Sequence, residues 1–216
     1  MPDRVVVTVG TKRGLFVLES NSRRERWNLR GPYLKGWSIY HAVVDGRRTP
    51  TIHAAANSDF LGCTTFRGDL RGKSFTGTKK PPIPPKLLPG QMKMLKQYGI
   101  STAARIWHIE PGRPSERNVL YAGTAPAGLF RTDDGGKTWD AVAGLLRHPS
   151  RPTWTPGAGG MCLHSIQLDP AHSGRMFVGI SSAGCFRTED AGKKWTRINQ
   201  SIPTHEGKPS DPNAGT

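Results

Sequence analysis

The sequence predicts an all-β protein, a partial β-propeller of about three and a half four-stranded blades. The first observation is the segment Thr132-x-Asp134-x-Gly136-x-x-Trp139, which returns 56 residues later as Thr188-x-Asp190-x-Gly192-x-x-Trp195. The second is that the flanks keep this spacing, in the pairs His108 and His164, Tyr121 and Phe177, and Phe130 and Phe186. A period near 50 residues made of short strands indicates a propeller or another array of repeated sheets.

The repeated segment has the composition of a hairpin whose tip is fixed by its own side chains. Thr and Asp side chains bond nearby backbone N–H groups, and Gly tolerates the positive φ of a chain reversal. The Leu-Phe-Arg-Thr stretch before the turn and Trp139 after it are β-prone and can pack. We therefore expect a structural role for both turns.

The segment resembles the Asp-box, or bacterial neuraminidase repeat, of sialidases, other glycosidases, sortilin-type receptors and propellers similar to photosystem II assembly factors. Residues 9–19, 106–112 and 156–166 are similar to a bacterial group of propellers described as glycosyl hydrolases with this repeat. The resemblance covers roughly residues 4–200. It implies a propeller fold and leaves two functional classes, a glycosidase-like hydrolase and a binding module, because enzymes and non-enzymes share the repeat.

Composition and charge limit the size class of the protein, its possible partners and its cellular compartment. A length of 216 residues suits one domain or part of a larger one, and 26 Gly with 18 Pro indicate many turns. The net charge of +15, with basic clusters at 23–26, 47–48 and 79–80, fits either an anionic partner or a basic solvated surface. There is no run of 18 apolar residues, no apolar signal-peptide core, and only three scattered cysteines. We expect a cytoplasmic protein without membrane, nucleic-acid, cofactor or metal partners.

The first two units differ from the later ones. Strands are expected at 5–10, at 14–19 and near Trp27, and residues 5–9 match residues 119–123. The chain would then begin with the second strand of a blade, so the first unit would have no inner strand. The second unit has strands at 41–44, 51–55 and 62–66 and an aromatic residue at Phe75. Its turn is degenerate, because Gly68 and Leu70 replace the Thr and the Asp.

The remaining chain completes the expected domain of residues 1–199. Residues 76–104 are an insertion with a stiff Pro-rich spacer at 79–86 and a short helix at 91–98. The third unit has strands at 105–110, 118–123, 128–132 and 139–142, and the fourth at 161–168, 175–180, 184–188 and 195–198. A loop rich in Gly and Pro, 143–160, joins the two. We expect residues 200–216 to be a disordered tail.

The long loops lie on the face opposite the Thr-x-Asp turns, and loops on rigid scaffolds often carry sites. His41, His108 and His164 begin the inner strands of three units, so they are expected around the mouth of the central channel. The sequence leaves several roles open for them: a metal site, an anion clamp, acid–base catalysis, or structural bonds to the backbone.

For hydrolysis this face offers one thin pair of carboxylates, Glu110 and Asp59. A glycosidase normally uses two, about 5–9.5 Å apart, and Asp134 and Asp190 lie on the other face. Residues 105–107, Arg-Ile-Trp, also lack the Arg-Ile-Pro stretch of sialidases. The candidate catalytic residues are Glu110, His108 and His164; the candidate ligand-binding residues are His41, Asp59, Trp107, Arg151 and Trp154.

We therefore predict a non-catalytic module that binds a ligand or a protein. The ligand would be a carbohydrate or another anionic molecule, and a partner chain could complete the ring. The alternative is a glycosidase-like hydrolase acting on a sugar at the channel mouth.

Overall fold

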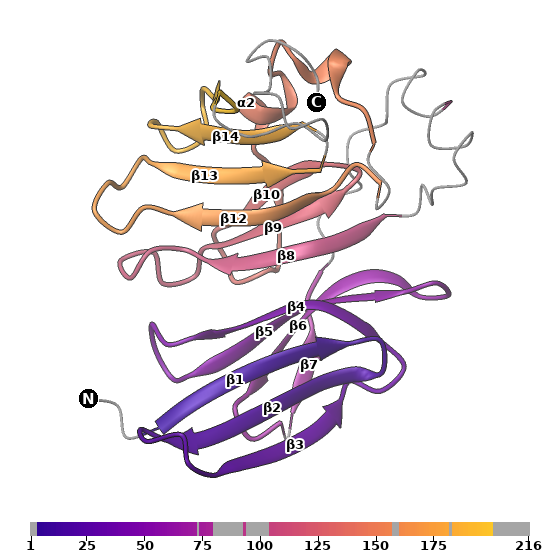
Figure 1. Ribbon diagram of the computed structural model, residues 1–216, viewed down its shortest axis with the longest axis vertical. Coiled ribbons are helices and arrows are strands. Elements are labelled where there is room, and N and C mark those ends of the chain that lie inside the picture. The colour runs from indigo at the N-terminus through magenta and orange to yellow at the C-terminus, as the bar shows by residue number, and fades with distance from the viewer. Residues whose placement is uncertain are drawn as a thin grey trace.

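The computed structural model describes residues 4–72, 74–79, 93, 104–156, 160–181 and 183–200. Its strands form one three-stranded and three four-stranded antiparallel sheets, which follow one another along the molecule (Figure 1). The predicted all-β class and the division into blades are confirmed. The expected helix at 91–98, the Pro-rich spacer and the tail lie outside the described residues, apart from Lys79, Lys93 and Gln200.

Each sheet is one blade, numbered in chain order. Blade 1 contains β1 (Arg4–Thr11), β2 (Gly14–Asn21) and β3 (Trp27–Tyr33). Blade 2 contains β4 (Ser38–Asp45), β5 (Thr51–Ser58), β6 (Gly62–Asp69) and β7 (Phe75–Gly77). Blade 3 contains β8 (Arg105–Pro111), β9 (Leu120–Ala125), β10 (Gly128–Thr132) and β11 (Asp140–Ala141). Blade 4 contains β12 (Leu163–Leu168), β13 (Met176–Ile180), β14 (Gly184–Thr188) and β15 (Thr196–Arg197).

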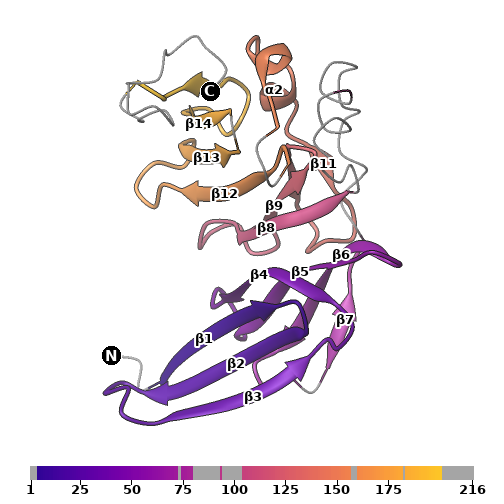
Figure 2. The ribbon, with the colours of Figure 1, turned by 45° about the vertical axis from the view of Figure 1, so that its right-hand side comes forward.

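The hydrophobic core of the described chain consists of three layers, one between each pair of successive blades. Figure 2 shows the order of the blades that enclose these layers. Leu15 and Val17 of blade 1 face Ile52 of blade 2, and Ala55 on the opposite face of blade 2 meets Ile106 and other residues of blade 3. Side chains alternate between the two faces of a strand, so each inner blade contributes to two layers. A blade of this kind depends on its neighbours for burial.

Glycines allow the blades to approach closely. A Cβ atom on Gly10 would lie 2.5 Å from the carbonyl oxygen of Ile39 in the next blade, and one on Gly123 would collide with that of Leu163. Gly10 and Gly123 occupy equivalent positions. The threonine after each, Thr11 or Thr124, pairs with the glycine that begins the next strand, Gly14 or Gly128. Residues 6–10, and not 5–9, therefore match residues 119–123, which corrects the predicted alignment by one residue.

The two Thr-x-Asp turns form as the sequence predicts. The Thr132 hydroxyl accepts a hydrogen bond from the Gly136 N–H (2.9 Å) and donates one to Asp134 (2.8 Å). Asp134 Oδ1 also accepts from the N–H groups of Lys137 and Thr138, at 2.8 and 2.9 Å. The same pattern recurs in blade 4, where Thr188 accepts from the Gly192 N–H at 3.0 Å. Side-chain oxygens thus satisfy the N–H groups of the reversing chain.

The connection 143–160 contains short helical segments, although the sequence predicts only a loop. Residues Ala143–Leu146 form helix α2, and Arg151–Thr153 form a 3-10 turn. Leu145 and Trp154 are buried with Phe186 in the layer between blades 3 and 4. Apolar burial orders residues 143–156 despite their glycine and proline content. No helix in the described part of the chain is long and apolar enough to cross a membrane.

Candidate functional site

Two histidines stack on one another at the inner strands of blades 2 and 3. The ring centroids of His41 (β4) and His108 (β8) lie 3.9 Å apart, with 20° between the ring planes. Each histidine follows a β-bulge and stands opposite a small residue of the neighbouring strand, Ala55 or Gly123. Bulges re-aim side chains, and here the repeated bulge brings two imidazoles from different sheets into contact.

Hydrogen bonds fix this histidine pair. His41 Nδ1 accepts a bond from the Ile109 N–H of the next blade at 3.4 Å. His108 Nε2 lies 3.2 Å from Glu110 Oε2, and Glu110 is two residues further on the same side of β8. Burial, and then the nearby His108, lower the pKa of His41 to about 4. The His41 imidazole is therefore uncharged at neutral pH, which argues against the anion clamp considered from the sequence.

His164 does not occupy the position that the 56-residue spacing predicts. The bulge of β12 lies between Leu163 and Ser165, and Ser165 stands opposite Gly179 as His108 stands opposite Gly123. Ser165 is thus the structural counterpart of His108, and His164 corresponds to Trp107. His164 is exposed, and its Nδ1 lies 2.8 Å from the Ser165 hydroxyl. Partial burial and the proximity of His108 lower its pKa.

An aromatic pair lies beside the histidines. Tyr40 and Trp107 precede His41 and His108 in the sequence, and their rings meet edge to face with centroids 4.9 Å apart. The indole N–H of Trp107 is buried and has no hydrogen-bond partner among the described residues. The sequence analysis selected Trp107 and missed Tyr40. The signal was the aromatic-histidine dipeptide that occurs in both units.

Asn57 positions the start of β8 and was also missed. Its side chain is buried; it donates to the Ile106 carbonyl (2.9 Å) and accepts from the Ile106 N–H (2.8 Å). The N–H and C=O groups of Ile106, the residue before Trp107, are thereby held by a side chain of blade 2. A polar residue directly after the alanine run 54–56 was the available signal.

The second candidate carboxylate is directed elsewhere. The Asp59 side chain is 85% exposed and forms an ion pair with Arg105 at 2.6 Å. Within the described residues, no hydrogen bond or ion pair joins Asp59 to Glu110 or to the histidines. The same part of the chain holds no group of three or more His, Cys, Asp or Glu side chains arranged to bind a metal ion.

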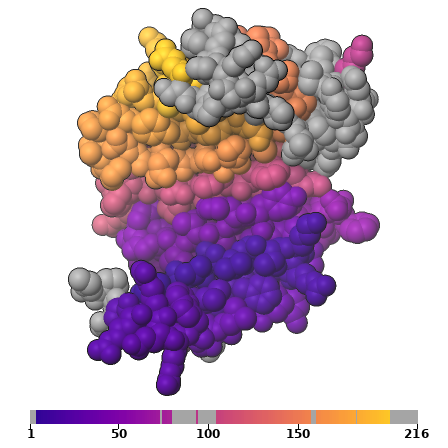
Figure 3. Space-filling view, in the orientation of Figure 1, coloured from indigo at the N-terminus to yellow at the C-terminus, as the bar shows by residue number. Residues whose placement is uncertain are grey.

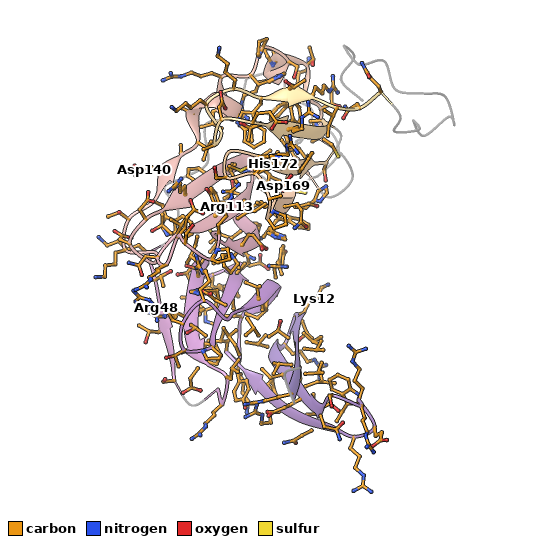
Figure 4. All side chains as sticks on the ribbon, turned by 90° about the vertical axis from the view of Figure 1, so that its left-hand side faces the viewer. Lys12, Arg48, Arg113, Asp140, Asp169 and His172 are labelled. Carbon is orange, nitrogen blue, oxygen red and sulfur yellow. The ribbon has the colours of Figure 1, made fainter. Side chains whose placement is uncertain are left out.

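Other carboxylates serve the opposite face. Asp45 pairs with Arg47 at 2.7 Å, and although burial opposes it, this arginine lowers the pKa of Asp45 to about 2. Asp169 accepts from the Ala171 N–H and contacts His172 and Arg175 at the turn after β12, close to Arg113 (Figure 4). These groups, like Asp134 and Asp190, are engaged in turn structure.

Two predicted ligand-binding residues belong to the core instead. Trp154 is 1% exposed, packs against Phe186 and donates its indole N–H to Ser150 at 2.9 Å. Arg151 is 8% exposed, lies over the Trp154 ring and donates to the Ala127 carbonyl at 3.1 Å. The folding of residues 143–156 onto blade 4 buries both, so we withdraw them from the site.

Comparisons with known proteins relate the chain to xyloglucanases. No protein-family model matches it. Over 86 residues it is 29% identical to an oligoxyloglucan-reducing end-specific xyloglucanase of Emericella nidulans, and over 91 residues 33% identical to a probable enzyme of this name from Neosartorya fischeri. These matches cover 39% and 42% of this chain and 10% of each relative.

The solved structure of the GH74 xyloglucanase from Xanthomonas campestris superimposes with a TM-score of 0.54 and 21% identity. It covers 89% of this chain, which in turn spans 28% of that enzyme. The fold is therefore a partial β-propeller similar to part of a glycoside hydrolase. The chain spans about a tenth of the curated relatives that it matches.

Proposed function

We propose that this chain is a non-catalytic propeller module that binds a carbohydrate at the inner strands of blades 2 and 3. The binding site consists of Tyr40, His41, Trp107, His108 and Glu110. The observation that carries the proposal is the combination of an aromatic pair with a stacked histidine pair that contacts a single carboxylate.

The carboxylates argue for binding over hydrolysis. Both common glycosidase mechanisms use two carboxyl groups that face one sugar linkage from about 5–9.5 Å apart. Glu110 contacts His108, whereas the exposed Asp59 pairs with Arg105. A lone carboxylate can accept a hydrogen bond from a sugar hydroxyl, but it cannot serve as both the acid and the nucleophile or base.

The polarity of the site suits a neutral sugar. The rings of Tyr40 and Trp107 offer apolar surface to the C–H groups of a sugar ring. The uncharged His41 attracts an anion less than a protonated histidine would. The curated relatives are named for action on oligoxyloglucan, and we extend the carbohydrate class to this chain.

A glycosidase-like hydrolase is the second candidate. Similarity to xyloglucanases and the contact between Glu110 and His108 favour it. In that case Glu110 would act as the acid or base. The second carboxylate would be one without a contact to Glu110 among the described residues.

Calorimetry and a turnover assay on the same purified chain separate these functions. The probes are oligoxyloglucan, a neutral cello-oligosaccharide, a sialylated oligosaccharide, and a panel of aryl glycosides that includes sialosides. We expect a neutral oligosaccharide to bind without release of product, and Glu110→Gln to weaken binding about tenfold, as for a hydrogen bond to a charged group.

The matched control is Phe60→Ser, because Phe60 is 97% exposed in the nearby loop between β5 and β6. This variant should bind as the unmodified chain does. Turnover that disappears in Glu110→Gln would establish the hydrolase, and failure of a folded chain to bind any of the sugars would reject a carbohydrate site.

A further inference from the structure

A basic pocket lies between blades 2 and 3, on the face that carries the Thr-x-Asp turns. It has a volume of about 70 Å³ and is lined from the turn between β4 and β5, from β6, and from the loop between β8 and β9. Its charged side chains are Asp45, Arg47, Arg48, Arg67 and Arg117. In Figure 3 the purple chain of blade 2 lies directly against the pink chain of blade 3, and Figure 4 shows Arg48 below Arg113.

The carboxylate of this pocket is already engaged. Asp45 Oδ2 lies 2.7 Å from Arg47 and 3.4 Å from His53 Nε2, and the three side chains are 12%, 8% and 7% exposed. Arg47 also donates to the Glu116 carbonyl oxygen, which holds the chain directly before Arg117. The Glu116 carboxylate itself pairs with two arginines outside the pocket. Blade 2 thus fixes the wall from which Arg117 extends, without neutralising Arg117.

Arg67 differs from its counterparts in blades 3 and 4. Strand pairing places Arg67, Arg131 and Arg187 at equivalent positions of their blades. Arg131 and Arg187 each form an ion pair with the carboxylate two residues later, at 2.6 and 3.1 Å. Among the described residues, Arg67 has no ion pair, and neither have Arg48 and Arg117. Three cations without a partner carboxylate therefore line one pocket.

A larger pocket of about 620 Å³ adjoins the basic pocket along β7. The residues that line both are Thr49, Thr51, Arg67 and Gly135. The larger pocket adds two cationic residues, Lys79 and Lys137, and the exposed hydroxyl residues Ser74 and Thr76. The two pockets together offer a strongly cationic end and a wider polar end.

We propose that these pockets bind a small organic phosphate monoester, with its phosphate group in the smaller pocket and its organic part in the larger one. Arginine donates paired hydrogen bonds to phosphate oxygens, and a cleft lined by one sign of charge concentrates counter-ions. Arg48, Arg67 and Arg117 supply these donors, and Arg47 positions the wall. A terminal phosphate suits a small pocket, whereas a nucleic-acid backbone needs a long basic surface. The proposal does not depend on the carbohydrate site.

Calorimetry at constant ionic strength tests the site, with inorganic phosphate, glycerol 3-phosphate and AMP as probes and adenosine as the control without phosphate. We expect the two organic phosphates to bind more tightly than inorganic phosphate, and adenosine to bind far more weakly than AMP. In NMR spectra, each phosphate should shift the ring resonances of His53, which lines the pocket, and leave those of His41 unchanged.

Arg67→Gln and Arg117→Gln should each weaken AMP binding about tenfold, as for the loss of a hydrogen bond to a charged group. The matched control is Arg187→Gln, the same charge change at the equivalent position of blade 4, which should leave AMP binding unchanged. The melting temperature of each variant checks folding.

Equal weakening in Arg187→Gln would overturn the proposal, because net charge and not the pocket would then attract the anion. So would a folded chain that binds none of the phosphates at millimolar concentration, or a shift at His41 in place of His53. A single-stranded oligonucleotide that binds and is not displaced by AMP would also overturn it, in favour of a nucleic-acid surface.

Discussion

Two regions of the molecule contain groups with lowered pKa values, for different physical reasons. They are the turn face, which carries the Thr-x-Asp turns, and the inner-strand site, which consists of Tyr40, His41, Trp107, His108 and Glu110. Asp134 has a pKa well below its usual range because the Thr138 hydroxyl and N–H, together with Thr132, bond its charged form. His41 has a lowered pKa mainly because burial disfavours its charged form. The first group is fully engaged in holding a turn. The second is an uncharged polar group beside aromatic rings, a suitable surface for a ligand.

The comparison also explains the scarcity of carboxylates at the candidate site. The repeat places Asp134 and Asp190 where the chain reverses direction, and there they accept hydrogen bonds from backbone N–H groups and stabilise the fold. Among the described residues, Glu110 is the one carboxylate in contact with the histidines of the inner-strand site. A family-level repeat can therefore suggest hydrolysis while its carboxylates serve structure.

The largest effect is expected from Trp107→Ala. Loss of the indole surface should weaken the binding of a neutral oligosaccharide by about 2–4 kcal/mol, the range of an aromatic binding hot spot. Calorimetry measures the change, with the melting temperature as a control for folding. Unchanged affinity would remove the aromatic pair from the site.

The next effect belongs to the turn face. Thr132→Val keeps the side-chain shape but leaves the buried Gly136 N–H without its acceptor. We expect the free energy of unfolding to fall by about 1–3 kcal/mol, with sugar binding unchanged. Denaturant unfolding and calorimetry test both parts. Loss of binding at an unchanged unfolding midpoint would mean that the turn face takes part in function.

A similar loss is expected when the degenerate turn of blade 2 is changed toward the others. In Gly68→Thr the new Cβ would lie 2.5 Å from the Phe75 ring and 2.8 Å from the Ser74 carbonyl oxygen. We expect about 1–3 kcal/mol of destabilisation from overcrowding. Asp69 already closes this tip by accepting from the Arg71 N–H at 2.7 Å. A gain in stability would show that blade 2 lacks only the side-chain hydrogen bonds of the Thr-x-Asp turn.

A pH-dependent effect separates the two regions. The pKa of His41 is lower in the folded chain than the 6.5 of an exposed histidine, so the unfolded chain binds the proton more readily. Stability from this group is lost as the pH falls from about 6.5 to about 4. The Asp134 and Asp190 pKa values are also lowered, but their contribution is lost only below the ordinary aspartate range.

Denaturant unfolding at pH 7 and pH 4.5 tests this separation. His41→Gln should reduce the loss of stability between the two values, and Thr132→Val should leave that loss unchanged. An identical pH dependence in His41→Gln and the unmodified chain would assign the acid sensitivity to other groups.

Much of the architecture could be predicted because it follows from local patterns. The repeated turn residues and the strand periodicity located the blades. Register was harder to predict, because a β-bulge inserts one residue without changing the sequence pattern. The 56-residue spacing therefore aligned His164 with His108, although strand pairing aligns Ser165 with it.

The sequence by itself determined the all-β class, the blade order and the structural role of Thr132, Asp134, Thr188 and Asp190, because these depend on contacts within one hairpin. Tertiary structure alone decided which side chains meet across blades. It stacked His41 on His108, placed Tyr40 beside Trp107, fixed Ile106 through Asn57 and buried Arg151 with Trp154. The first three contacts join residues far apart in the chain, and the burial of Arg151 and Trp154 depends on the distant residues Ala127 and Phe186. Their geometry depends on bulges and packing between sheets that no local pattern specifies.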